Sequence, residues 1–152
     1  MKQFIAVLVI VSLFFSSCGD SPKAKESKTI EQVKMVCDIA PLLNKSIDDI
    51  AVILGKPTDW TEPTKLQMNS GFDTWDNTFK LPNLDIMVTY NPQTRKVKDI
   101  FLPTSESNGT SDYSSLLQKG NLSESNQSYN IKPVIMARDK SKYTGIIVSL
   151  VE

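Results

Sequence analysis

The side chains in this sequence that could carry out chemistry are carboxylates, because the chain contains no histidine. Histidine is the commonest general base, so Ser-His-Asp and Cys-His catalysis are excluded within the chain. Asp73, Asp76 and Asp85 lie close together in the sequence, and glycan hydrolysis needs two acids roughly 5–10 Å apart. Asp73 and Asp76 face opposite sides of a predicted strand, however, and Asp85 begins a different strand. We therefore expect no catalytic pair and no enzyme.

Metal and cofactor chemistry is disfavoured for the same reason. A zinc site without histidine would need cysteines or carboxylates alone, and Cys37 is the only cysteine after position 18. The segment 73–77 lacks the spacing and the following glycine of a calcium loop. None of the six glycines forms a phosphate-cradling run. The sequence predicts no cofactor and no metal.

The other cysteine, Cys18, follows a segment that is typical of an export signal. Lys2 supplies a positive charge, residues 4–15 are apolar except for Ser12, and Ser16 and Ser17 precede the cysteine. The apolar run is shorter than the roughly 20 residues that a membrane-spanning helix needs, so it predicts a removable signal over residues 1–17. A cysteine at the cleavage site resembles the lipobox of bacterial lipoproteins. The resemblance implies that the sulfur of Cys18 receives a diacylglyceryl group and that Cys18 becomes the mature N-terminus.

Two alternatives stay open for this segment, namely an ordinary signal peptide with a coincidental cysteine and an anchor that is never cleaved. The lipoprotein resemblance implies a lipid-anchored protein of the bacterial cell envelope. The outer membrane is favoured over the inner one, and the periplasmic face and the cell surface both stay open. Removal of Lys2 with the signal leaves 16 basic residues facing 17 acidic ones. A near-neutral chain without a basic run argues against nucleic acid as a partner. The expected partners are the membrane, through the lipid on Cys18, and an envelope protein.

Residues 18–28 are polar and charged and predict a flexible tether, followed by a single α+β domain over residues 29–152. Ile30, Val33, Cys37 and Ala40 form an apolar stripe that predicts a helix from Thr29 to Pro41. On that stripe Cys37 is expected to be buried and inert, the alternative being a reactive thiol or an intermolecular disulfide.

A second helix is predicted to begin at Ser46, with Asp49 as its capping-box partner and Gly55 as its C-terminal stop. Its predicted buried face comprises Ile47, Ile50, Ala51 and Leu54.

The period of the apolar pattern changes to two after Pro57. Strands are predicted over residues 72–79, 85–90 and 96–102, which form an antiparallel meander covered by the two helices. Residues 130–138 and 143–151 predict an additional C-terminal β-hairpin, whose last strand is apolar on both faces and therefore central or covered. Pro133 suits an edge strand. The polar stretch between them, residues 103–130, contains one predicted short helix over 112–120 and is expected to be either mobile or functional.

Residues 42–57 consist of a short capped helix that ends in Leu54-Gly55-Lys56-Pro57 and precedes the meander. This arrangement resembles the outer-membrane assembly lipoproteins of the BamE (SmpA/OmlA) family and the β-lactamase-inhibitor-protein-like domains. The resemblance covers roughly residues 30–102. The long polar segment and the extra hairpin after Leu102 depart from the pattern of those families.

The sequence favours a non-catalytic module that binds another protein or has a structural role in the envelope. Trp60, Trp75 and Tyr90 are the candidate partner contacts, because Trp and Tyr carry much of the energy of protein interfaces. The alternative for each is a core or half-buried sheet residue. A periplasmic small-ligand carrier is the alternative function, and a carboxylate-based envelope hydrolase is a further one.

Overall fold

The structure, a computed structural model, describes residues 33–59 and 61–151. The predicted signal, Cys18, the tether and Trp60 lie outside these residues. The elements in chain order are a 3₁₀ turn η1 (Ala40–Asn44), α1 (Ile47–Leu54), α2 (Lys65–Asn69), β1 (Trp75–Leu81), β2 (Leu84–Tyr90), β3 (Val97–Pro103), α3 (Ser114–Lys119), β4 (Tyr129–Ile135) and β5 (Tyr143–Leu150). The predicted α+β class is confirmed.

All five strands form one antiparallel sheet in the order β1-β2-β3-β5-β4. The predicted meander corresponds to β1, β2 and β3, and the predicted C-terminal hairpin corresponds to β4 and β5. β5 inserts between β3 and β4, which agrees with the expectation from its two apolar faces that it is a central strand. Pro133 lies on β4, an edge strand of the sheet, where a residue without an N–H group costs no ladder hydrogen bond.

The helix predicted at Ser46 is confirmed as α1. The Ser46 hydroxyl accepts a hydrogen bond from the Asp49 amide at 3.1 Å, and the Asp49 carboxylate accepts one from the Ser46 amide at 3.2 Å. Gly55 ends the helix with a positive φ of 89°, a conformation that residues with a Cβ rarely adopt. Ile47 and Ile50 are fully buried. The capping box and the glycine therefore fix both ends of a helix with one apolar face.

The helix predicted over residues 29–41 is wrong for the part that the structure describes. Residues 33–39 are not helical, and only the turn η1 follows, with Pro41 in its first turn. The amides of Val36 and Cys37 donate to the Lys119 carbonyl at 2.9 and 3.1 Å, and the Ile39 amide donates to the Gly120 carbonyl at 3.1 Å. Tertiary partners thus replace the hydrogen bonds that a helix would have supplied.

Cys37 lies in this extended stretch and is half-buried rather than buried in a helical stripe. Burial, with a smaller contribution from the neighbouring Asp38, raises the pKa of its thiol. A thiol with a raised pKa is less nucleophilic at neutral pH, which agrees with the expected inert role.

The polar segment 103–130 contains a helix and several turns, and its hydrogen bonds connect it to the N-terminal stretch. The short helix predicted over 112–120 is confirmed as α3, and its residue Leu116 is buried in the core. The carbonyls at the end of α3, those of Lys119 and Gly120, accept the hydrogen bonds from residues 36–39.

The helix α2 was not predicted from the sequence. Thr64 and Gln67 cap this helix reciprocally, the Thr64 amide donating to the Gln67 side chain at 2.8 Å. The motif Thr-x-x-Gln was the available signal. None of the residues of α2 is buried.

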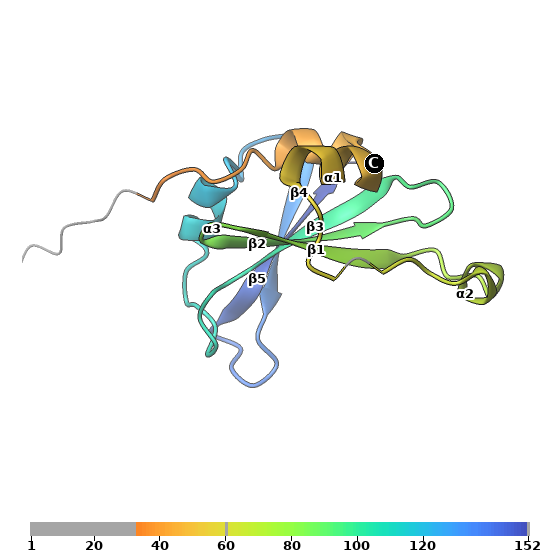
Figure 1. The fold of residues 1–152 in the computed structure, drawn as a ribbon. Coiled ribbons are helices and arrows are strands. Elements are labelled where there is room, and N and C mark those ends of the chain that lie inside the picture. The colour runs from red at the N-terminus through yellow and green to blue at the C-terminus, as the bar shows by residue number, and fades with distance from the viewer. Residues whose placement is uncertain (1–32, 60, 152) are drawn as a thin grey trace, which may run out of the picture. The chain divides into compact units, whose positions relative to one another are not determined.

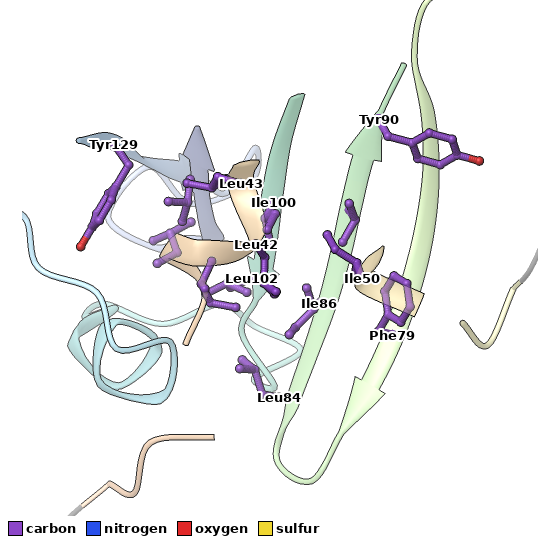
Figure 2. Close-up of a cluster of buried hydrophobic side chains, with 14 of the residues drawn as sticks. Leu42, Leu43, Ile50, Phe79, Leu84, Ile86, Tyr90, Ile100, Leu102 and Tyr129 are labelled. Carbon is purple, nitrogen blue, oxygen red and sulfur yellow. The ribbon is translucent and has the colours of Figure 1, made fainter. Parts of the chain in front are cut away.

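The core lies on one face of the sheet, under η1 and α1. Figure 1 shows these two elements on the same side of the strands. In Figure 2, Leu42 and Leu43 of η1 and Ile50 of α1 lie among strand residues that include Ile100 and Leu102. The elements η1 and α1 therefore cover one face of the sheet, and neither of them lies on the other face.

Candidate interaction surface

Tyr90 is a core residue, so its predicted role as an exposed contact is wrong. The residue is wholly buried at the end of β2. Its hydroxyl oxygen has no hydrogen-bond partner among the described residues, and burial raises the pKa of the phenol. The Arg95 guanidinium carbon lies 5.3 Å from the centre of its ring, within cation–π range. The alternation along β2 that placed Tyr90 with Ile86 and Val88 was correct, and that alternation is the signal of burial.

Trp75 is half-buried and packs against the core. Its indole nitrogen donates a hydrogen bond to the Thr61 carbonyl at 2.9 Å, which ties the segment before α2 to β1. These contacts give Trp75 a structural role. The third predicted contact, Trp60, lies outside the described residues.

Arg95 organises an ion cluster at the same end of the covered face as Tyr90 and Trp75. Its Nε and Nη2 donate to the two oxygens of Asp48 at 3.0 and 2.6 Å, and its Nη1 donates to Glu62 at 2.7 Å. The Asp48 hydrogen bond raises the pKa of Arg95 further and lowers the pKa of Asp48. Because one guanidinium engages both carboxylates, the cluster fastens α1 to the β2–β3 turn, and each of the two acids already has a partner.

The three aspartates considered for catalysis do not converge. Asp73 forms an ion pair with Lys98 at 2.7 Å. Asp76 lies opposite Thr89, and Asp85 lies opposite Lys80, so the two acids are separated by four residues of β2. At roughly 3.4 Å per residue this separation is about 14 Å, which exceeds the spacing for paired-acid glycan hydrolysis.

The second face of the sheet carries no helix of the described chain and bears two adjacent rows of side chains. The pairing register places Val88, Ile100 and Val148 in one buried row, so the residues next to them along each strand point to the opposite face. One row on that face, which we call the polar row, contains Asp76, Thr89, Asp99, Ser149 and Asn130. The next, the apolar row, contains Met87, Phe101 and Ile147, flanked by Thr78 and Lys132. We call this surface the open face.

The side chains of the apolar row are half-buried, whereas the core residues behind them are fully buried. Phe101 is fixed in position by a glycine on β5. A Cβ built on Gly145 would lie 2.6 and 2.7 Å from ring carbons of Phe101 and 2.3 Å from the Leu102 carbonyl oxygen. The Phe101 ring therefore packs directly against the backbone of β5, in space that a larger residue at position 145 would occupy.

The polar row has unused capacity for charge pairing. The ion pairs among residues 33–59 and 61–151 involve the acids Asp48, Glu62 and Asp73. Asp76 is exposed, Asp99 is half-buried, and neither has an ion-pair partner in that part of the chain. This row is a candidate functional feature that was not predicted from the sequence, since only the strand register brings its five residues together.

The two edges of the sheet are closed to an additional strand. On β1, the amide of Thr78 donates to the Asp59 carboxylate at 2.7 Å and its carbonyl accepts from the Thr58 amide at 2.8 Å. On β4, Pro133 has no N–H group to donate. Partners that add a strand use a free row of backbone groups, and neither edge offers an uninterrupted one.

A further exposed apolar site is the loop that contains α2. Leu66 and Phe72 are 76% and 50% exposed. α1 adds Val52, which is 87% exposed, on its outer side. These side chains lie outside the strands that carry the polar and apolar rows.

The described residues contain no candidate membrane-spanning helix and no candidate metal-binding cluster. No helix in residues 33–59 and 61–151 is long and apolar enough to cross a membrane. No group of three or more acidic or cysteine side chains in the same part of the chain could hold a metal ion.

Comparison of the chain with protein-family models, curated proteins and solved structures found no match. The resemblances to bacterial lipoproteins and to the BamE and β-lactamase-inhibitor-protein families therefore stay predictions.

Proposed function

We propose that this protein is a non-catalytic, lipid-anchored module of the bacterial cell envelope that binds another protein through the open face. The observation that carries the proposal is a sheet face that no described helix covers. It has a half-buried apolar row beside a polar row whose two carboxylates have no ion-pair partner among the described residues. Surfaces of this composition, with an aromatic or Met centre and a polar surround, are typical of protein interfaces.

The anchor in this proposal rests on Cys18 and the apolar segment before it. The lipid would hold the domain near a membrane, where the partner would be another envelope protein. Anchoring two components to one membrane raises their effective concentration, so an interface of modest affinity suffices.

The test is photo-crosslinking in intact cells, with a photoreactive amino acid at Thr89 or Asn130 on the open face. Val52 on the outer side of α1 is the matched control, because it is exposed but lies over the opposite face of the sheet. We expect one crosslinked protein from both open-face positions and none from Val52, and we expect Cys18→Ala to weaken the crosslink. A partner captured only from Val52 would place binding elsewhere, and the absence of any crosslinked partner would contradict a protein-binding role.

A small-ligand carrier is the second candidate, favoured by one observation on the covered face. Asn77 is wholly buried, and neither its amide nitrogen nor its amide oxygen has a hydrogen-bond partner among the described residues. It lies diagonally from Tyr90 across β1 and β2, at about 7–8 Å between Cα atoms, and the Tyr90 hydroxyl is also unpartnered. A polar ligand that reached these groups would satisfy them. A thermal-shift screen of polar small molecules tests this candidate, and a carrier requires a ligand that stabilises the wild type but not Asn77→Leu.

A further inference from the structure

We propose that the partner segment that binds the open face is a basic amphipathic helix that lies across the strands. This inference rests on the proposed function and adds the chemistry of the partner. It requires cations to face the polar row and apolar side chains to face the apolar row.

The charges of the polar row select a cationic partner. Asp76 and Asp99 are the charged residues of this row, and they lie on β1 and β3 with β2 between them. Two inter-strand spacings separate them by about 10 Å. No lysine or arginine occurs in the row, and the nearest cation in the adjacent apolar row is Lys132, on the edge strand β4. An anionic partner would meet unpaired carboxylates, whereas a partner with two cations about 10 Å apart would pair both of them.

A helix supplies cations at that spacing. Residues i and i+7 of an α-helix lie on one side of it and are separated by about 10.5 Å along its axis. Lysine or arginine at these two positions would therefore face Asp76 and Asp99 when the helix axis runs across the strands.

The apolar row matches the same orientation. Met87, Phe101 and Ile147 lie on the adjacent strands β2, β3 and β5, which are about 4.8 Å apart. The pitch of an α-helix is about 5.4 Å, so an apolar stripe with one residue per turn meets one of these side chains at each turn. The two rows are about 7 Å apart along the strands, which is less than the 10–12 Å diameter of a helix with its side chains. One helix can therefore contact both rows.

The rest of the sheet excludes the main alternative for a peptide partner. An extended peptide that added to an edge would need free backbone groups, but Thr58 and Asp59 occupy those of Thr78, and Pro133 interrupts the β4 edge. Recognition by side chains on the open face remains. The Phe101 ring, packed against Gly145, lies on the middle strand of the sheet and supplies the centre of the apolar row.

The experiment measures binding of a fluorescent 18-residue peptide to the full-length lipidated protein in nanodiscs of zwitterionic lipid, by fluorescence anisotropy. The probe is a Leu/Lys peptide with an amphipathic helical pattern. One control peptide has the same composition in scrambled order, a second has Glu in place of Lys, and empty nanodiscs measure adsorption to lipid. We expect the amphipathic Lys peptide to bind more tightly than both controls and to weaken as salt is added.

Matched variants locate the site. The double variant Asp76→Asn/Asp99→Asn should bind the Lys peptide about tenfold more weakly, since two charge contacts are lost. Asp38→Asn/Glu106→Gln also removes two carboxylates, both exposed and both outside the polar and apolar rows, and should bind like the wild type. Met87→Thr should also weaken binding, whereas Val52→Thr should not, and circular dichroism of each variant checks that it is folded.

Each contrary result overturns the proposal in a recognisable way. Equal binding of the scrambled peptide would reduce the effect to net charge, and preferential binding of the Glu peptide would reverse the predicted chemistry. Self-association of the wild type that Met87→Thr abolishes would identify a second copy of this chain as the occupant. If Asp76→Asn/Asp99→Asn binds as the wild type while Thr89 and Asn130 still crosslink a partner, the helix inference fails and the binding-module function stands. If the crosslinks fail as well, both fail.

Discussion

Arg95 has a larger structural role than any other charged residue that the structure describes. It bridges Asp48 of α1 and Glu62, lies over the ring of Tyr90, and adopts a positive φ of 62°. Its carbonyl also accepts a hydrogen bond from the Ile47 amide at 2.9 Å. A non-glycine residue in that backbone region is held there by its surroundings. The guanidinium contacts supply that restraint.

At the scale of single residues, we expect Arg95→Ala to lower the free energy of unfolding by about 1–2 kcal/mol. Hydrogen bonds to charged groups contribute roughly 1.5–3 kcal/mol, and solvent screening at this partly exposed site reduces that value. Urea denaturation followed by tryptophan fluorescence measures the change. Lys98→Ala, which removes the exposed pair with Asp73, is the control and should leave the midpoint unchanged. An equal loss in both variants would show that the cluster is no stronger than an isolated surface pair.

Asn77 is a buried polar residue whose replacement should stabilise the fold. Its amide is enclosed without a hydrogen-bond partner in the described part of the chain, and an unsatisfied buried amide costs roughly 1–3 kcal/mol. Asn77→Leu keeps a similar shape and should raise the unfolding free energy by about 1 kcal/mol. A marked loss of stability would instead mean that a water molecule or another group satisfies the amide.

Residue-scale prediction from the sequence succeeded where a local rule applied and failed where the partner was distant. The Ser46–Asp49 capping box was predicted because its partners lie three residues apart. The Asp48–Arg95 pair joins residues 47 positions apart, and no local sequence pattern predicts it. The burial of Tyr90 follows from strand alternation, although an interface role had been weighed for it.

The two capping boxes of the fold should differ in their effect on global stability. α1 presents Ile47 and Ile50 to the core, whereas α2 buries none of its residues. Ser46→Ala should therefore cost about 1 kcal/mol of unfolding free energy, within the usual range for loss of a helix N-cap. Thr64→Ala should unwind α2 locally without changing the global midpoint. Hydrogen exchange distinguishes the two outcomes, and a global loss in Thr64→Ala would show that the α2 loop is coupled to the core.

At the scale of elements, the strands were predicted more accurately than the first helix. Alternating burial sets strand positions within a few residues, so β2 differs by one residue at its start from the prediction over 85–90. The apolar stripe through Cys37 suggested a helix, but Ile39 is the fully buried residue of that stretch. The carbonyls of Lys119 and Gly120, which determine the extended path, lie about 80 residues away in the sequence.

For the whole molecule, the absence of histidine predicts a broad pH range of constant stability. The Arg95 hydrogen bond lowers the pKa of Asp48, and the Ser46 hydroxyl lowers that of Asp49. Groups with a lowered pKa in the folded state contribute stability above their unfolded pKa of roughly 4 and lose that contribution as the pH falls. Burial raises the pKa of the Cys37 thiol in the folded state above its ordinary value of 9.0. As the pH rises past 9, the unfolded state therefore loses the thiol proton before the folded state does, and the free energy of unfolding falls.

We therefore expect the free energy of unfolding to be constant from about pH 5.5 to 8, to fall below about pH 4.5 and to fall above about pH 9. Urea denaturation across a pH series measures this profile. Arg95→Ala should show a shallower acid limb and Cys37→Ala a shallower alkaline limb. A step between pH 6 and 7 would contradict the assignment.

The open face could not be predicted at the scale of the whole molecule. Its polar row draws one residue from each strand, and their alignment depends on four pairing registers and on the insertion of β5 between β3 and β4. The residue types were visible in the sequence, but their juxtaposition was not.

The attachment of residues 36–39 to the end of α3 has a mechanical consequence. Tension that arrives along the chain from its N-terminal side reaches three hydrogen bonds, from Val36, Cys37 and Ile39, before it reaches η1. Because Ile39 is also wholly buried, and Val36 and Cys37 pack against the core, core packing resists this load together with the hydrogen bonds. A pull from the N-terminal side therefore acts on the end of α3 and on the core before it acts on any strand of the sheet.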